Sequence, residues 1–359
     1  MIKSLRQQTL HYFARPHEGP LREPLNVRAA WRGDALQNGG TWRAQLAPDE
    51  VDELKRAVAQ AMASGRPLRR LRREDFPLPR LAPRSDRWRA EVRDGRGFQL
   101  ISGVPVQDWS EEEAATFFWG LGQHLGLPGA QNPQGDLLGH VRDQRTGQDV
   151  RYYRTNKAIK VHCDAADLVG LLCLQPARSG GLSRIVSSVT VYNELLKSAP
   201  ALAERLYQPL YFDTKGEGGI KAFPIRPCAY AGGVLRTFWQ SDYYRTAPEV
   251  PGVPPLDDAA RELLARYDAI AETPGIYLDM DLQPGDVQLL SNHTILHART
   301  GFEDSEEPGK QRHLLRLWLS LPEDRPLKLR WLRARSWVGL HATAVRELVQ
   351  AVTGRRASA

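Results

Sequence analysis

The pattern of hydrophobic and polar positions changes near residue 97. Upstream of it, one stretch has the apolar spacing of a helix, and we predict that helix at residues 48–63. The prolines of the following PLPRLAPR stretch predict an end to regular structure, because proline neither continues a helix nor sits inside a central strand. We therefore expect residues 1–97 to form an irregular, arginine-rich N-terminal extension that contains one helix.

From residue 98 onward, short apolar runs separated by turn residues dominate the pattern. Strands are predicted at residues 98–101, 168–174, 184–189, 235–239, 276–279, 286–290 and 313–319. Helical periodicity predicts helices at residues 109–125, 190–199, 257–272 and 339–352. Many short strands with turn signals indicate a mainly β domain with flanking helices over residues 98–359, built as a double-sheet sandwich or a barrel.

The composition narrows the class of protein. The chain has 359 residues, of which 42% are hydrophobic and 25% charged, as in ordinary globular proteins. No apolar run approaches the roughly 18 residues that a membrane span needs, and the first residues do not resemble a signal peptide. Three cysteines are too few for a disulfide framework, so we expect a reducing, cytoplasmic location.

The net charge of +7 is concentrated in one segment. Between Arg66 and Arg96 there are eleven arginines and five acidic residues. Such a segment can bind nucleic acid, or it can form a solvated face with local ion pairs. Few aromatic residues lie among these arginines to stack on bases, so the second interpretation is favoured and nucleic acid is not an expected partner.

The first candidate for chemistry is the triplet His162-Cys163-Asp164. If it lies in a strand, His162 and Asp164 point to the same face. An imidazole and a carboxylate together suit a first-row divalent metal such as Fe(II), although such triplets also occur by chance.

Two further runs carry candidate residues. In NHTILHARTG, His293 and His297 compete to be a third metal ligand, and either could instead be a hydrogen-bonded core residue. In RHLLRLWLS, strand alternation places Arg312 and Arg316 on one mostly apolar face. Buried guanidinium groups need an anion, which is either an internal carboxylate or the carboxylate of a small molecule.

These motifs, together with SGGLS between them, resemble in order and spacing the taurine dioxygenase-like family of Fe(II)/2-oxoglutarate-dependent oxygenases. That family includes relatives of clavaminate synthase and butyrobetaine hydroxylase. The resemblance covers roughly residues 98–321 and implies a double-stranded β-helix, or jelly roll. It also implies Fe(II), 2-oxoglutarate and O2 as cofactor and co-substrates, with decarboxylation of 2-oxoglutarate to succinate.

The family pattern implies a metal triad of His162, Asp164 and His297. His293 falls where the family has a non-ligand residue, so it is left out of the triad. The presence of Asp164 argues against a halogenase, because halogenating relatives lack this carboxylate.

The same pattern implies binding roles for five other residues. Arg312 falls where the family's arginine holds the distal carboxylate of 2-oxoglutarate, and Ser183 falls where relatives have a threonine that helps. Arg316 corresponds to an arginine that meets the substrate's acid group in some relatives and supports 2-oxoglutarate in others. Asn156, with the neighbouring Thr155, is a candidate substrate contact.

We therefore predict an enzyme that hydroxylates, desaturates or cyclises a small, carboxylate-bearing substrate, anionic or zwitterionic, such as an amino acid or a derivative. Two alternatives remain: an oxygenase that modifies nucleic acid or protein, and a non-catalytic metal-binding jelly roll. A zinc hydrolase is disfavoured because Thr294 stands where an H-E-x-x-H motif has glutamate. No membrane partner is expected, and assembly into a homo-oligomer is left open.

Overall fold

The computed structural model describes residues 2–37, 40–143, 156–216 and 221–321. Its α-helices are α1 (Leu5–Phe13), α2 (Pro48–Ala63), α3 (Ala82–Asp94), α4 (Glu111–Leu125), α5 (Ser188–Ser198), α6 (Pro200–Arg205), α7 (Ser241–Thr246) and α8 (Asp258–Ala271). Its strands are β1 (Arg43–Gln45), β2 (Phe98–Ser102), β3 (Leu127–Pro128), β4 (Leu138–Val141), β5 (Ile159–His162), β6 (Leu168–Gln175), β7 (Ser179–Gly180), β8 (Ser183–Ser187), β9 (Leu210–Asp213), β10 (Ala222–Ile225), β11 (Cys228–Ala231), β12 (Val234–Thr237), β13 (Tyr277–Met280), β14 (Val287–Ser291), β15 (Ile295–Arg299), β16 (Phe302–Glu303) and β17 (His313–Ser320).

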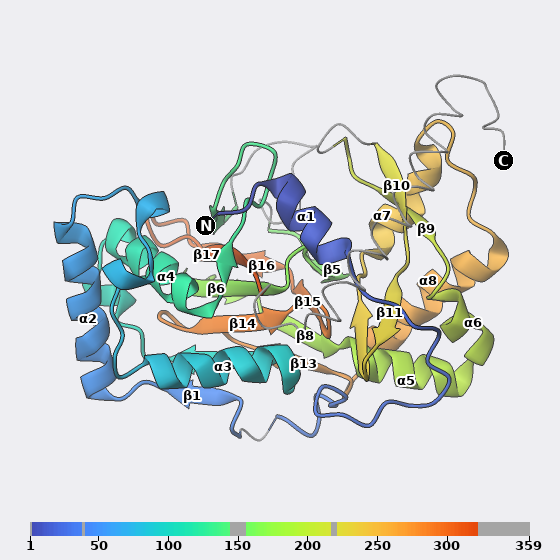
Figure 1. The fold of residues 1–359 in the computed structure, drawn as a ribbon, viewed down its shortest axis with the longest axis horizontal. Helices are drawn as coiled ribbons and strands as arrows, with labels where there is room; N and C mark the ends of the chain where they lie inside the picture. Colours follow the sequence, from blue (N-terminus) through green and yellow to red (C-terminus); the bar gives the residue numbers. More distant parts are fainter. Residues whose placement is uncertain (1, 38–39, 144–155, 217–220, 322–359) are drawn as a thin grey trace.

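Two sheets form the centre of the molecule (Figure 1). The large sheet has the strand order β1-β2-β14-β6-β17-β3, with β4 also paired to β17. The small sheet has the order β13-β8-β15-β5. Apart from the parallel β1–β2 pair, the described pairs in both sheets are antiparallel. The prediction of a mainly β architecture with flanking helices is confirmed.

Strand alternation sorts the apolar side chains into three layers. On β17, Leu315, Leu317 and Leu319 face a core shared with α2, α3 and α4. Leu314 and Trp318 face the opposite way, into a core between the two sheets that also contains Ile295 of the small sheet. The outer face of the small sheet packs on a third core, formed with α1, α5, α6 and α8. In Figure 1, α2, α3 and α4 accordingly gather at one end and α5 to α8 at the other.

The prediction of a single helix in the N-terminal extension is wrong. The helix at residues 48–63 is present as α2, but α1 and α3 are helices as well. Helix α3 begins within the proline-rich stretch, with Pro83 in its first turn, where a missing N–H costs no hydrogen bond. Helix α1 has a capping box between Ser4 and Gln7 but only a weak apolar stripe. The spacing of its apolar residues therefore did not predict a helix.

The helices and strands predicted within residues 98–321 lie within a few residues of observed elements, but other short strands and helices, among them β5 and β15, had no predicted range. The strand expected at residues 184–189 ends earlier, because Ser187 caps the N-terminus of α5. The helix predicted at residues 339–352 lies outside the described residues. The division of the chain at residue 97 stays a prediction; β1 pairs with β2 across it. None of the helices in the described ranges is long and apolar enough to cross a membrane.

Candidate metal and co-substrate site

The two histidines of the predicted triad lie on neighbouring strands. His162 ends β5, and His297 of β15 is its direct partner in the antiparallel pair, with ring centroids 4.2 Å apart. Asp164 follows β5 and reaches both rings: its carboxylate oxygens lie 4.0 Å from Nε2 of His162 and 3.7 Å from Nε2 of His297. One donor atom from each residue therefore lies within 4.8 Å of the other two.

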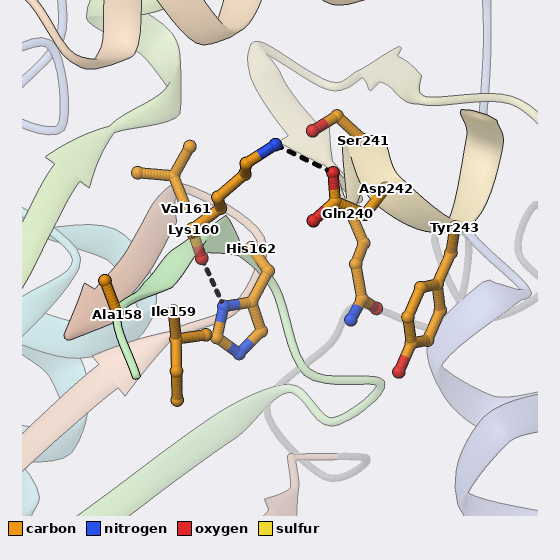
Figure 2. Close-up of a pocket in the computed structure, with 9 residues that line it drawn as sticks. All are labelled: Ala158, Ile159, Lys160, Val161, His162, Gln240, Ser241, Asp242 and Tyr243. Carbon is orange, nitrogen blue, oxygen red and sulfur yellow. Dashed lines mark hydrogen bonds and ion pairs between the residues drawn. The ribbon is translucent and has the colours of Figure 1, made fainter. Parts of the chain in front are cut away.

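Both imidazoles are placed for metal binding. The Nδ1–H of His162 donates to the carbonyl of Lys160 at 2.9 Å (Figure 2), which leaves Nε2, the atom 4.0 Å from Asp164, as the nitrogen available to a metal. Burial, together with the neighbouring His162, lowers the pKa of His297 to about 3, which keeps this ring neutral.

Two side chains of β17 hold the Asp164 carboxylate. The indole Nε1–H of Trp318 donates to Oδ2 at 2.9 Å, and Nη1 of Arg316 lies 3.4 Å from the same oxygen. Burial alone would raise the pKa of Asp164, but Arg316 and the two histidines lower it below its ordinary value. An ionised carboxylate beside two imidazoles is a donor set that fits Fe(II).

Arg312 immediately precedes β17, and only 5% of it is exposed. Within the described residues its Nη1 has no hydrogen-bond partner. Burial lowers the pKa of Arg312 to about 10. Gly181 leaves space for this guanidinium, because a Cβ at that position would lie 3.2 Å from Nε of Arg312. A buried guanidinium with an unused donor fits the carboxylate of a bound anion.

Arg299 is a second buried arginine, and the sequence analysis did not identify it. Its guanidinium lies 4.6 Å from the centre of the Phe302 ring, and that of Arg312 lies 5.3 Å from the same ring. Burial and the charge of Arg312 lower the pKa of Arg299 to about 9. Arg299 lies two residues after His297, so strand alternation places both side chains on the inner face of β15. This spacing could have identified Arg299 from the sequence.

The remaining predicted residues have partners of other kinds. Ser183 lies opposite Arg299 in the β8–β15 pair, and its hydroxyl donates to Oε1 of Gln288 at 2.9 Å. Asn156 is exposed, and its carbonyl accepts from the backbone N–H of Phe302. Thr155 lies outside the described residues.

Arg316 and His293 are also engaged. Besides its contact with Asp164, Arg316 donates through Nε to Gln131 at 2.8 Å. His293, the other candidate for third ligand, places Nε2 2.7 Å from Asp167 and stacks on Tyr12. The structure thus brings His162, Asp164 and His297 together and gives His293 a different carboxylate.

A cavity of about 120 Å³ opens beside His162. Residues 158–162 line one side and residues 240–243 the other, with Gln240 and Tyr243 among the latter (Figure 2). An ion pair of 2.9 Å between Lys160 and Asp242 joins the two sides. The aromatic run at residues 238–244 is therefore divided: Phe238, Trp239 and Tyr244 are core residues, whereas Tyr243 lines the cavity.

One family model and two known proteins match most of this chain. The model of the taurine catabolism dioxygenase TauD, TfdA family matches residues 64–318. The FR-33289 synthase of Streptomyces rubellomurinus is 29% identical over 85% of this chain and 93% of its own length. The taurine hydroxylase-like protein SAT17 of Stachybotrys chartarum is 27% identical over 82% of this chain and 79% of its own length.

Solved structures share the fold at low sequence identity. An asparagine oxygenase in complex with Fe(II), 3-hydroxyasparagine and succinate superposes with a TM-score of 0.64 and 15% identity, over 78% of this chain and 93% of that one. The non-heme iron oxygenase OrfP in complex with Fe and α-ketoglutaric acid gives a TM-score of 0.57 and 17% identity, over 77% of this chain and 93% of the OrfP chain.

The family match covers more than half of the chain. It confirms the resemblance inferred from the four motifs, and with it the predictions of a dioxygenase and of iron and 2-oxoglutarate as its cofactor and co-substrate. The chain belongs to the taurine catabolism dioxygenase TauD, TfdA family.

Proposed function

We propose that His162, Asp164 and His297 bind Fe(II), that Arg312 binds 2-oxoglutarate, and that the enzyme oxidises a small, carboxylate-bearing substrate of the amino-acid class. The observation that carries this proposal is the convergence of two imidazoles and one ionised carboxylate within 4.8 Å. With iron bound, 2-oxoglutarate and O2 supply the oxidising power, and 2-oxoglutarate leaves as succinate.

The protein's own residues position these groups. The carbonyl of Lys160 fixes the tautomer of His162, and Trp318 fixes the orientation of Asp164. Arg312 offers its unused Nη1 to the distal carboxylate of 2-oxoglutarate, and Arg299 adds a second positive charge nearby. Ser183, opposite Arg299, is a further candidate on this side. We infer that the two sheets form a double-stranded β-helix whose inner faces exclude water from the site.

The cavity beside His162 is the proposed substrate site. Arg316 at one side of the metal triad, and Lys160 with Asp242 at the cavity, offer both signs of charge, which suits a zwitterion. The solved structures that share the fold support this substrate class, since two of them hold 3-hydroxyasparagine and 3-hydroxy-L-arginine. We place Asn156, close to β5 in the sequence, as a further substrate contact. The three buried free cysteines accord with a cytoplasmic location.

An anaerobic titration tests the cofactor assignment. Metal-free protein is loaded with Fe(II) and then with 2-oxoglutarate, and the visible charge-transfer band of a chelated keto acid is recorded. We expect a band in the wild-type protein and none in His297→Ala. Arg312→Ala should need at least about tenfold more 2-oxoglutarate, because it loses charge-assisted hydrogen bonds. Arg178→Ala, which removes an exposed arginine paired with Glu303, is the matched control and should titrate like the wild type.

Two outcomes of this titration would contradict the assignment. If iron is bound but no band forms, 2-oxoglutarate does not chelate the metal. If Arg312→Ala titrates like Arg178→Ala, the buried arginine does not hold the co-substrate.

A second experiment tests the substrate class. Succinate release is measured with a panel of L-amino acids and with the matching carboxamides, which lack only the carboxylate charge. We expect stimulation by members of the first set alone, and a loss of that stimulation in Arg316→Met at saturating 2-oxoglutarate. If Arg316→Met raises the KM for 2-oxoglutarate as much as that for the amino acid, Arg316 belongs to the co-substrate site instead.

A further inference from the structure

A second group of metal-ligating side chains lies apart from the triad. It consists of Glu111 at the start of α4, His140 on β4 and His313 at the start of β17. Nδ1 of His140 lies 2.9 Å from Nε2 of His313 and 3.5 Å from Oε1 of Glu111. One donor atom from each of the three residues lies within 4.8 Å of the others.

The topology places this cluster on the outer face of the large sheet. His140 is directly opposite Leu315 in the β4–β17 pair, so His140, Leu315 and His313 share one face. Leu315 belongs to the core beneath α4, whereas Arg316 faces the core between the sheets and contacts Asp164. The sheet therefore separates the cluster from the predicted iron triad.

The chemical state of the cluster favours a cation. The side chain of His313 is 12% exposed, and burial lowers its pKa to about 4, so the ring is neutral at pH 7. Nδ1 of His140 and Nε2 of His313 are hydrogen-bonded at 2.9 Å, so one of these two nitrogens donates to the other. In the tautomer of His140 that carries its proton on Nε2, both of these nitrogens are available as ligands beside the Glu111 carboxylate.

The distances are close to those of a tetrahedral zinc site. Zinc–nitrogen bonds of about 2.1 Å place tetrahedral ligand atoms roughly 3.4 Å apart. The measured 2.9 Å and 3.5 Å lie on either side of that value. Arg142 is the charged neighbour that opposes a cation here, since its charge also lowers the pKa of His313.

We propose that Glu111, His140 and His313 form a second divalent-cation site of zinc type, with water as the fourth ligand. A cation bound there would link α4, β4 and the start of β17. His313 directly follows Arg312, so the cation would also fix the backbone next to the arginine proposed to hold 2-oxoglutarate.

Metal counting tests this inference independently of the iron assignment. Chelator-treated protein is dialysed against Zn²⁺ at low micromolar concentration, and bound metal is measured by atomic emission. We expect two zinc ions per wild-type chain, one in His162→Gln, one in His140→Gln and none in the double variant. Glu112→Gln, which removes an exposed neighbour of Glu111, is the matched control and should keep two.

A second measurement covers the case in which a variant is less well folded. In the His162→Gln background, Zn²⁺ should raise Tm by several degrees, because only the native state binds it. That rise should disappear when His140→Gln is added. If His140→Gln retains the wild-type zinc content, or if the rise in Tm survives its addition, the second site does not exist. The amount of zinc that His162→Gln loses relative to the wild type tests the triad, whereas the loss in His140→Gln tests this proposal.

Discussion

At the scale of single residues, the central feature is a carboxylate held by an indole. Asp164 is buried, and its Oδ2 accepts the Nε1–H of Trp318 at 2.9 Å. A ligand that is oriented in advance binds metal more tightly, and loss of such an outer hydrogen bond costs about 10- to 100-fold in affinity. Trp318 is also on the inner face of β17, so the strand that carries Arg316 and directly follows Arg312 helps to build the metal site.

We therefore expect Trp318→Phe to weaken Fe(II) binding about tenfold while the chain stays folded. Phenylalanine retains most of the apolar contact with the core between the sheets but cannot donate to Asp164. Anaerobic equilibrium dialysis measures the affinity, and circular dichroism checks the fold. Trp109→Phe, at a partly buried position that packs against the core beneath α4, is the control and should bind iron like the wild type. Equal affinity in both variants would show that the indole only fills space.

At the scale of elements, the notable feature is how α1 is attached to the sheets. Asp167 is a fully buried carboxylate between two imidazoles: His11 of α1 and His293, which precedes β15, each place Nε2 2.7 Å from it. The backbone N–H of Leu321 donates to the same group at 2.8 Å. This cluster connects the N-terminal helix to the segment that leads to His297.

Replacing His11 with alanine should destabilise the protein by about 2 kcal/mol, because the buried Asp167 carboxylate loses one of its hydrogen-bond partners. Urea unfolding measures the loss, and hydrogen exchange should show faster exchange in α1 than elsewhere. Arg6→Ala, at an exposed position of the same helix, should change neither. Unchanged protection of α1 in His11→Ala would mean that apolar packing of Tyr12 and Phe13 alone holds the helix.

At the scale of the whole molecule, the arginine-rich segment is a network of ion pairs. Asp49 and Glu50 of α2 pair with Arg80 and Arg84, and Glu91 pairs with Arg96. Arg66 pairs with Asp75. Arg80 and Arg84 thus join α3 and its preceding loop to α2, whereas the pairs of Arg66 and Arg96 lie within the segment.

We therefore expect no specific nucleic-acid binding by this segment. A titration of labelled single- and double-stranded DNA should give weak binding at 50 mM salt that changes less than tenfold up to 200 mM. A surface that neutralises six or more phosphates would lose about a thousandfold over that range. A slope of that size would revive the interpretation of an oxygenase that acts on nucleic acid.

Much of the fold and part of the site follow from local pattern. The period of two in a strand predicted that Arg312, Leu314, Arg316 and Trp318 share one face. In the structure Leu314 and Trp318 lie in the core between the two sheets, and Arg316 contacts Asp164. The period of helices located α2, α4, α5 and α8 within a few residues. These features were predictable because each depends only on neighbours along the chain.

Tertiary structure alone decided which distant residues meet. Residue type and spacing left His293 and His297 as competitors, and the family resemblance selected His297. In the structure the β5–β15 register places His297 against His162, while Asp167 contacts His293. The same holds for Arg299 beside Arg312, and for Glu111, His140 and His313, which come from three elements. The sequence analysis missed α3 because the prolines of the PLPRLAPR stretch were interpreted as an end to regular structure. In the structure Pro83 lies in the first turn of α3, and the apolar side of this helix packs into the core shared with α4 and the large sheet. The sequence by itself determined the residue types and the face that each presents. The choice among partners required the folded sheets, because contacts between segments far apart in the chain follow from strand register and packing, which local periodicity does not encode.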